Sequence, residues 1–456
     1  MKTIGVLTSG GDAPGMNAAI RAVVRTGCES GMKVMGIRRG YKGLIEGDMF
    51  EMNLRSVSDI IHRGGTMLYS ARCPEFAESE VQDKAVEVCK EFGLDGIVAI
   101  GGDGTFMGAR ALTLKGVPCI GIPGTIDNDI ASTSHTIGYD TALNTIMDMV
   151  DRVRDTTESH DRCSVIEVMG IRRGYKGLIE GDMFEMNLRS VSDIIHRGGT
   201  MLYSARCPEF SESEVQDKAV EVCKEFGLDG IVAIGGDGTF MGARALTLKG
   251  VPCIGIPGTI DNDIASTSHT IGYDTALNTI MDMVDRVRDT TESHDRCSVI
   301  EVMGRNAGFL ALNAGIAVGA TCILVPEIDY DIDSYIIERM KRTMTTGKHH
   351  FIVIVAEGVK GVEVGSLAKY IEEKTGVESR ATVLGHVQRG GSPSVRDRVI
   401  ASKMGYHAVQ LLKQDIGNRV VAIDHAEIVD YDIIEALNMK KTIDPELYKI
   451  ANEISI

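Results

Sequence analysis

Short apolar runs alternate along the chain with longer segments in which apolar residues recur every three or four positions. The short runs are rich in β-branched residues, which favour strands. They are Ile4–Thr8, Gly96–Ile100, Cys119–Ile122, Ser164–Val168, Cys322–Val325, Phe351–Val355 and Thr382–Leu384. Segments with helical spacing, such as Val81–Phe92 and Ala142–Arg154, lie between several of these runs. The pattern predicts an α/β protein with mainly parallel sheets and helices on both faces.

One segment of this pattern occurs twice. Residues Val34–Glu167 recur as Val168–Glu301, at an offset of 134 positions, and the copies differ only at Ala77 and Ser211. Because surface positions tolerate substitution cheaply, an old duplication would have diverged there. The near-identity therefore indicates a very recent duplication or an assembled sequence. Without one copy, 322 of the 456 residues remain, and we take these as the parent chain.

The repeat divides the chain into four segments. They are the N-terminal segment 1–33, the first copy 34–167, the second copy 168–301 and the C-terminal segment 302–456. We expect 1–33 to supply the first strand and helix of a nucleotide lobe, and 302–456 to supply a substrate lobe.

Composition excludes several classes of function. Charged residues make up 25% and hydrophobic residues 43% of the chain, as in ordinary globular proteins. A formal net charge of −16 argues against binding nucleic acid, which requires clustered Lys and Arg. The N-terminal run resembles a strand rather than a signal peptide. Phe309–Pro326 is interrupted by small and polar residues, so we predict a helix and a strand there instead of a membrane span. The ten scattered cysteines are typical of free thiols in the cytoplasm.

Glycine-rich motifs follow the predicted strands, where parallel sheets bind ligands. The first motif runs from Thr8 to Asn17 and leads into a helix. Its glycines would let backbone N–H groups approach a phosphate at the helix N-terminus. The spacing fits neither a Walker A loop nor a dinucleotide fingerprint, and a simple turn is the alternative.

The second motif, Gly-Gly-Asp-Gly-Thr, occupies Gly101–Thr105 and Gly235–Thr239. Glycines on both sides of one carboxylate leave room for a triphosphate, and that carboxylate can hold Mg²⁺. NAD kinases and lipid kinases carry a similar motif. A turn with an Asp cap is the alternative, but it does not require so many glycines.

The third motif, Pro-Gly-Thr-Ile-Asp-Asn-Asp, occupies Pro123–Asp129 and Pro257–Asp263. One of its two carboxylates can accept a proton from a hydroxyl group while the other supports a metal ion. An Asp-rich turn is the alternative.

Together these motifs resemble those of the 6-phosphofructokinases, and the resemblance covers the whole parent chain. Glu301–Gly308 resembles the family's substrate loop, and Gly385–Pro393 resembles its second sugar-phosphate loop. The resemblance implies two doubly wound, mainly parallel-sheet lobes, with much of the nucleotide lobe duplicated. It also implies MgATP-dependent phosphorylation of fructose 6-phosphate to fructose 1,6-bisphosphate, in a homotetramer.

The resemblance assigns roles by position. Asp127 or Asp261 would be the general base, with Thr125 or Thr259 beside it, and Asp103 or Asp237 would hold magnesium. Arg72 or Arg206 would neutralise charge on the transferring phosphoryl group. ATP or ADP would contact Gly11, Arg72, Cys73, Gly102, Asp103, Gly104, Thr105 and the second-copy residues Arg206, Cys207, Gly236, Asp237, Gly238, Thr239. Fructose 6-phosphate would contact Arg162, Arg296, Met303, Gly304, Arg305, Glu357, Arg380, His386 and Arg389.

Glycines at two positions favour ATP over pyrophosphate as the donor. Relatives that use pyrophosphate carry Asp at the position of Gly104 and Gly238, and Lys at that of Gly124 and Gly258. The resemblance also implies an effector site for ADP or phosphoenolpyruvate, formed by Arg21, Arg25, Arg154, Arg288, Gly319 and Lys348. Thr321 and Thr346 depart from the residues common there, Glu and Lys, so regulation is expected to be blunted.

The two copies compete for one N-terminal segment and one C-terminal segment. The first copy runs into Ile171, whereas the second runs into Arg305 and the substrate lobe. We therefore expect the second copy to complete the site, with the first copy as an insertion after Gly31–Lys33. Synthesis order favours the opposite pairing of the first strand. Two alternatives remain open: a catalytically impaired subunit that acts only in assembly, and another kinase with this glycine loop.

Overall fold

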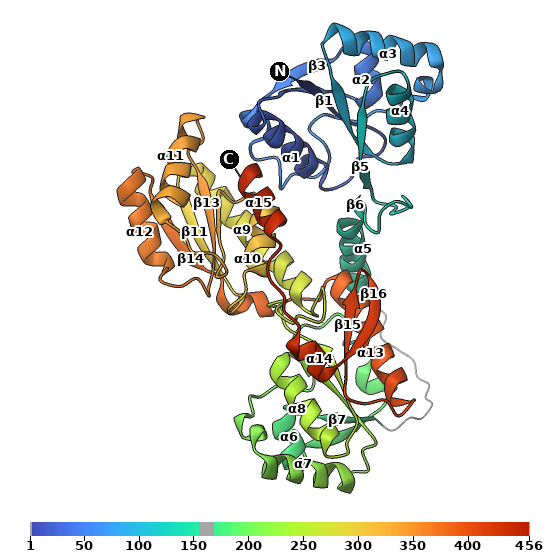
Figure 1. Ribbon diagram of the computed structural model, residues 1–456, viewed down its shortest axis with the longest axis vertical. Helices are drawn as coiled ribbons and strands as arrows, with labels where there is room; N and C mark the ends of the chain where they lie inside the picture. Colours follow the sequence, from blue (N-terminus) through green and yellow to red (C-terminus); the bar gives the residue numbers. More distant parts are fainter. Residues whose placement is uncertain (1, 155–167, 456) are drawn as a thin grey trace.

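The computed structural model of the chain describes residues 2–154 and 168–455. It forms three lobes, each built around its own sheet (Figure 1). The predicted α/β architecture is confirmed, because parallel strand pairs predominate in the three lobe sheets and helices alternate with the strands.

The first lobe combines the N-terminal segment with the first copy. Its sheet has the order β3-β2-β1-β4-β5-β6. These strands are β1 Thr3–Thr8, β2 Lys33–Ile37, β3 Met49–Met52, β4 Gly96–Gly101, β5 Cys119–Thr125 and β6 Ile137–Gly138. The helices are α1 Met16–Glu29, α2 Gly40–Glu46, α3 Ser79–Glu91 and α4 Asp103–Leu114. Because side chains alternate across a strand, Val6 packs with α1 on one face and Leu7 packs with α2 and α3 on the other.

The first strand lies in the centre of this sheet. It pairs in parallel with β2, Ile4 opposite Val34, and with β4, Ile4 opposite Gly96. The expected pairing with the second copy is therefore not the one observed. Only residues 30–32 separate α1 from β2, so the first copy is the nearest partner by chain connectivity. Which copy carries activity remains a prediction.

The second lobe combines the second copy with part of the C-terminal segment. Its main sheet has the order β16-β15-β10-β9, and β7 and β8 form a separate hairpin. The strands are β7 Val168–Ile171, β8 Met183–Met186, β9 Ile231–Gly235, β10 Cys253–Pro257, β15 Arg419–Asp424 and β16 Glu427–Asp432. The helices are α6 Tyr175–Glu180, α7 Ser213–Glu225, α8 Asp237–Leu248, α13 Val395–Leu412 and α14 Ile433–Asn438.

The third lobe has a four-stranded parallel sheet, in the order β12-β13-β11-β14. The strands are β11 Cys297–Val302, β12 Cys322–Leu324, β13 Phe351–Ala356 and β14 Ser379–Val383. The helices are α9 Tyr273–Ser293, α10 Phe309–Ala317, α11 Glu338–Thr345, α12 Val364–Thr375 and α15 Pro445–Ile454. The helix and strand predicted within Phe309–Pro326 are confirmed as α10 and β12.

Helix α5, Tyr139–Arg154, runs from the first lobe toward the second, and these two lobes lie at opposite ends of the long axis (Figure 1). Helix α15 of the third lobe contacts α1 of the first. The predicted strand Ser164–Val168 lies outside the described residues except for Val168, which begins β7. Within the described ranges, no helix is both long and apolar enough to cross a membrane. The nine cysteines described there are free thiols.

One apolar face distinguishes the two copies. In the first copy Val34, Val57 and Ile100 are fully buried in one cluster with residues of β1 and α1. Their counterparts in the second copy, Val168, Val191 and Ile234, are 52%, 44% and 64% exposed. The opposite face is buried in both copies, as Leu44 and Leu178 illustrate. The N-terminal segment therefore accounts for the difference.

Charging the same valine in each copy tests this arrangement. Val34→Asp places an unpaired carboxylate in the core and should cost about 3 kcal/mol or more, because buried charges without partners are severely destabilising. Val168→Asp should change stability by about 0.5 kcal/mol or less, as at other exposed positions. Calorimetric unfolding of both variants measures the difference. The reverse order would place the first strand in the second copy.

Candidate functional site

Two loops of the second copy meet at one edge of the second lobe's sheet. Strands β9 and β10 are parallel neighbours, with Gly235 opposite Pro257 at their carboxyl ends. Gly236, Asp237, Gly238 and Thr239 follow β9 into the first turn of α8, and Thr259–Asp263 follow β10. Parallel pairing therefore brings the second and third motifs together, as the sequence predicted.

Asp261 is the buried carboxylate of this edge. It is 6% exposed, and its Oδ1 has no hydrogen-bond partner among the described residues. Its backbone N–H donates to Thr259 Oγ1 at 3.2 Å. Burial raises the pKa of Asp261, and the charges of Asp263 and Glu357 raise it further, while Arg389 opposes the shift. The site thus holds a carboxylate of increased basicity.

Asp237 belongs to the same group of charges. Partial desolvation and the neighbouring carboxylate of Asp263 raise its pKa, and Arg305 opposes the shift. Arg305, which follows the second copy in the chain, therefore influences the charge of Asp237 within that copy. Two carboxylates that can share a cation are a suitable oxygen donor set for Mg²⁺, which needs only one or two from the protein when phosphates supply others.

A strained turn presents the predicted substrate residues. Gly304 has φ of 141° and Arg305 has φ of 55°, a left-handed value that non-glycine residues rarely adopt. Glu357 stabilises this turn, because its Oε1 accepts hydrogen bonds from the Gly304 N–H at 3.3 Å and the Arg305 N–H at 2.7 Å. A side chain at Gly358 would collide with the Arg305 carbonyl. Glu357 therefore positions the turn as well as contributing charge.

Sequence reasoning missed two residues that organise this region. Gln388 is 1% exposed and accepts a hydrogen bond from the Met303 N–H at 3.1 Å. Asp397 is equally buried and accepts hydrogen bonds from the Gly272 and Thr275 N–H groups, both at 2.9 Å. Gln388 lies inside Gly385–Pro393, the segment that resembles the second sugar-phosphate loop, so its place in the sequence could have indicated a role. No sequence motif indicated a role for Asp397, because its partners lie more than 120 positions earlier in the chain.

The first copy presents the same loops without the third lobe. Asp127 is exposed, and its Oδ2 accepts a hydrogen bond from Thr125 Oγ1 at 3.3 Å. Thr105 is buried and donates to the Ser9 carbonyl at 3.1 Å. Gly102, Asp103 and Gly104 therefore lie beside the loop that contains Gly11. The structure does not bring Gly11 to Asp237 and Asp261, because the first and second lobes lie at opposite ends of the molecule (Figure 1).

Arg72 and Arg206 are exposed, each directly before a half-buried cysteine and a short 3₁₀ turn. Burial raises the pKa of the Cys73 thiol to about 11 and also raises that of Cys207. Both cysteines therefore carry protons at neutral pH.

The predicted substrate arginines fall into two groups. Arg305, His386 and Arg389 follow the carboxyl ends of β11 and β14. Arg296 and Arg380 lie at the opposite ends of these parallel strands, where both pair with Glu378, at 2.9 Å and 2.6 Å. A six-residue strand is about 20 Å long, so one chain cannot bring the two groups together. Arg162 lies outside the described residues.

The predicted effector residues converge between the first and third lobes. Burial and the charges of Arg25 and Arg288 lower the pKa of Arg21 to about 9. Burial and the neighbouring arginines lower the pKa of Lys348 to about 7. Gly319 has φ of 61°, and a Cβ added there would lie 3.1 Å from the Arg21 guanidinium. The side chain of Arg154 lies outside the described part. The cluster suits an anion.

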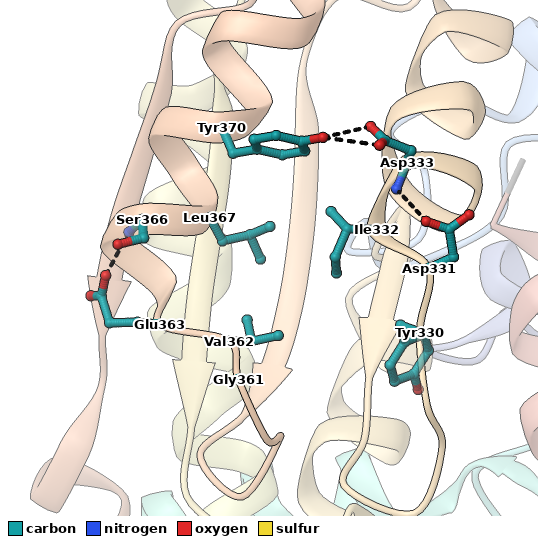
Figure 2. A pocket seen from close by; sticks show the side chains of 10 residues that line it. All are labelled: Tyr330, Asp331, Ile332, Asp333, Gly361, Val362, Glu363, Ser366, Leu367 and Tyr370. Atoms are coloured by element: carbon teal, nitrogen blue, oxygen red, sulfur yellow. Dashed lines mark hydrogen bonds between the residues drawn. The ribbon is translucent and has the colours of Figure 1, made fainter.

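A separate cavity of about 490 Å³ lies in the third lobe, between the start of a π-helical turn and α12 (Figure 2). Asp331, Asp333 and Glu363 lie at its rim, and Tyr370 donates hydrogen bonds to Asp333 at 2.8 and 3.0 Å. Three carboxylates disfavour a phosphorylated ligand. The predicted substrate residues are absent from its described lining.

Comparisons with known proteins also divide the chain near the boundary between the two copies. The family model described as Phosphofructokinase matches residues 3–172 and again residues 170–412. The chain is 56% identical over 292 residues to the ATP-dependent 6-phosphofructokinases of Bacillus velezensis and Bacillus cereus. Each alignment covers 64% of this chain and 90% of the relative.

Two solved structures share the fold. Phosphofructokinase from Pichia pastoris in the T-state is similar with a TM-score of 0.91 and 20% identity, over 99% of this chain and 81% of that one. Phosphofructokinase from Saccharomyces cerevisiae gives a TM-score of 0.88 and 20% identity, over 100% of this chain and 99% of that one. At this identity the likeness concerns the fold.

Removing the Glu357 carboxylate tests the origin of the strained turn. Glu357→Ala should increase amide exchange in residues 303–305 by about ten-fold or more, because hydrogen bonds to charged groups contribute about 1.5–3 kcal/mol. Glu363→Ala, which removes the N-cap of α12 in the same lobe, is the matched control. Hydrogen-exchange mass spectrometry can follow this segment alone, because the first copy continues into Ile171. Unchanged exchange in Glu357→Ala would contradict the assignment.

Proposed function

Because this chain belongs to the phosphofructokinase family, we propose that it transfers the γ-phosphoryl group of ATP to the 1-hydroxyl of fructose 6-phosphate, with Asp261 as the general base. The observation that carries the proposal is the unpartnered Oδ1 of Asp261. A buried carboxylate oxygen without a donor is costly unless a ligand hydroxyl completes it. Family membership supports the reaction class, and the relatives' names support ATP as the donor.

In the proposed reaction the sugar oxygen bonds to the γ-phosphorus while the bond from that phosphorus to the β,γ-bridging oxygen breaks. The hydroxyl proton passes to Asp261, and ADP leaves. The raised pKa of Asp261 suits proton transfer near neutral pH, since efficient bases have a pKa close to the working pH. Arg305 and Arg389 would bind the anionic sugar, and Arg206 would offset charge on the transferring group.

Asp237, with Asp263 nearby, would hold Mg²⁺, which neutralises phosphate charge when it is bound. Gly238 supports ATP as the donor, because a Cβ built there meets nothing within 4 Å apart from its adjacent residues and the backbone of its own helix. That open space leaves room for an α-phosphate, and a glycine at position 238 adds no carboxylate that would repel it. Gly104 is equally open in the first copy.

We further propose that the active form is an assembly of several chains, a homotetramer as in the family. The position of Arg296 and Arg380, at the sheet edge opposite Arg305, supports this proposal. From there they would serve the sugar-phosphate site of a neighbouring chain. The buried cations Arg21, Arg25, Arg288 and Lys348 would bind an anionic effector such as ADP or phosphoenolpyruvate. The sequence repeat supports a tandem duplication within the parent enzyme.

A second candidate function is an impaired subunit that acts only in assembly. The position of Gly11 favours it, because that loop lies with the first copy while the substrate residues lie with the second. Size-exclusion chromatography combined with an assay for fructose 1,6-bisphosphate separates the two candidates. An assembled chain without turnover would support the second.

Substituting the two candidate bases separately tests the role of each copy. Asp261→Ala should lower kcat by about 10²–10⁴-fold, the usual effect of losing a general base. Asp127→Ala, its matched control in the first copy, should change kcat less than two-fold. A coupled assay for fructose 1,6-bisphosphate measures both. Equal losses, or a loss confined to Asp127→Ala, would refute the assignment to the second copy.

The neighbouring carboxylate provides a test by pH. Asp263 raises the pKa of Asp261, because its negative charge favours the protonated form. A general base works only when ionised, so activity should fall as the pH drops through this raised pKa. Asp263→Asn removes the charge and should move the acid limb of kcat/KM to lower pH, even if kcat itself falls. Asp129→Asn should leave the limb in place, and a shift to higher pH in Asp263→Asn would contradict the account.

A further inference from the structure

An apolar face of the second copy lies uncovered in the described chain. Val168 lies on β7, Val191 ends a short 3₁₀ helix and Ile234 lies on β9, and all three are at least 44% exposed. Strand β9 is the last strand of its sheet, so its outer edge has no strand partner within the described residues. An exposed edge beside exposed apolar side chains is a ready template for another strand.

The first copy shows which segment fits this face. There the same residue types are buried by Val6 of β1 and by Met16, Ile20 and Val24 of α1. Strand β1 lies between β2 and β4, with residues 4–7 paired to both neighbours. The second copy presents the same sequence in β7 and β9, so a strand identical to β1 would find the same pairs. The first copy therefore indicates both which segment fits this face and which residues of it would pair with β7 and β9.

We propose that residues 3–29 of a second copy of this chain dock between β7 and β9. That pairing would place the donor's Gly11 loop beside Gly235 and Thr239, in the loop that carries Asp237, as it lies beside Gly101 and Thr105 in the first copy. The nucleotide loop and the substrate turn would then meet in one site, formed by two chains. This consequence for catalysis rests on the proposed function, whereas the docking itself does not.

Chain connectivity favours a second chain over the chain's own segment. Residues 30–32 join α1 to β2, and a fully extended connection from Glu29 to Lys33 spans roughly 14 Å. While β2 stays in the first lobe, this link cannot reach β9 at the other end of the molecule (Figure 1). The first lobe of a neighbouring chain has no such restriction, because it can lie directly beside the second lobe.

Exchange between chains requires little net free energy. Each donated segment uncovers on the donor the same apolar face that it covers on the acceptor, so the buried area is nearly unchanged. Contacts of α1 with the third lobe, such as Arg25 Nη1 to the Ile454 carbonyl at 3.3 Å, would be lost from the donor. Exchange of identical elements is a low-cost route to association, and it depends on protein concentration.

The experiment mixes two variants, each of which carries one added cysteine besides the ten native ones. Ile4 lies opposite Val34 in the first copy, so docking would place it opposite Val168. Neighbouring strands lie about 4.8 Å apart, within the range of Cα separations that disulfides bridge. One chain carries Ile4→Cys and the other Val168→Cys. After mild oxidation of the mixture, we expect a product of twice the chain mass, in which peptide mapping joins positions 4 and 168.

A single chain with Ile4→Cys and Val34→Cys is the positive control and should form an internal disulfide. If that control forms and the mixture gives no link between positions 4 and 168, the proposal is wrong. It is also wrong if a chain carrying both Ile4→Cys and Val168→Cys forms only the internal link. A cross-linked dimer that does not phosphorylate fructose 6-phosphate would support the docking and count against the proposed function.

Discussion

Much of this structure depends on a single strand at the centre of a mainly parallel sheet. Strand β1 pairs on both sides and anchors α1, and together they bury one complete apolar face. The chain contains two faces of the same sequence and only one such segment. One sheet is therefore complete on this side, and the other ends at β9. The C-terminal strand β15, by contrast, serves only the second copy, where it pairs with β10. Among the described residues the first copy has no such strand beside β5, and Ile120 of β5 is exposed.

This division also separates the chemistry. The first copy receives the Gly11 loop, so its motifs resemble a nucleotide site without a sugar site. The second copy receives the substrate turn, and the charges of Arg305, Glu357 and Arg389 shift the pKa values of its carboxylates. Identical loops acquire different electrostatic environments: the pKa of Asp261 is raised by burial, whereas Asp127 is exposed to solvent. The position of a residue in the chain, rather than its local sequence, decides its chemistry here.

Local pattern was sufficient to predict several strands of the three lobe sheets and the shared edge of the site. β-Branched runs predicted these strands, and parallel pairing of β9 with β10 explains why the loops of Asp237 and Asp261 lie at the same sheet edge. The predicted run Thr382–Leu384 found β14 but not its start at Ser379, because Ser379 and Arg380 are polar. Sequence could not decide which copy takes β1, since both offer the same partners. Nor could it reveal Asp397, whose carboxylate links α13 to the start of α9 across more than 120 residues.

Hydrogen exchange in the shared strand tests the central claim, that β1 covers the first copy and leaves the second open. Peptides around Gly96–Gly101 and Gly230–Gly235 have the same sequence, so a conservative Val98→Ile change would separate them by mass. In dilute solution the account predicts slow exchange for the heavier peptide, from a strand paired on both sides, and faster exchange for the lighter one. Equal exchange in both, or slower exchange in the lighter peptide, would contradict it.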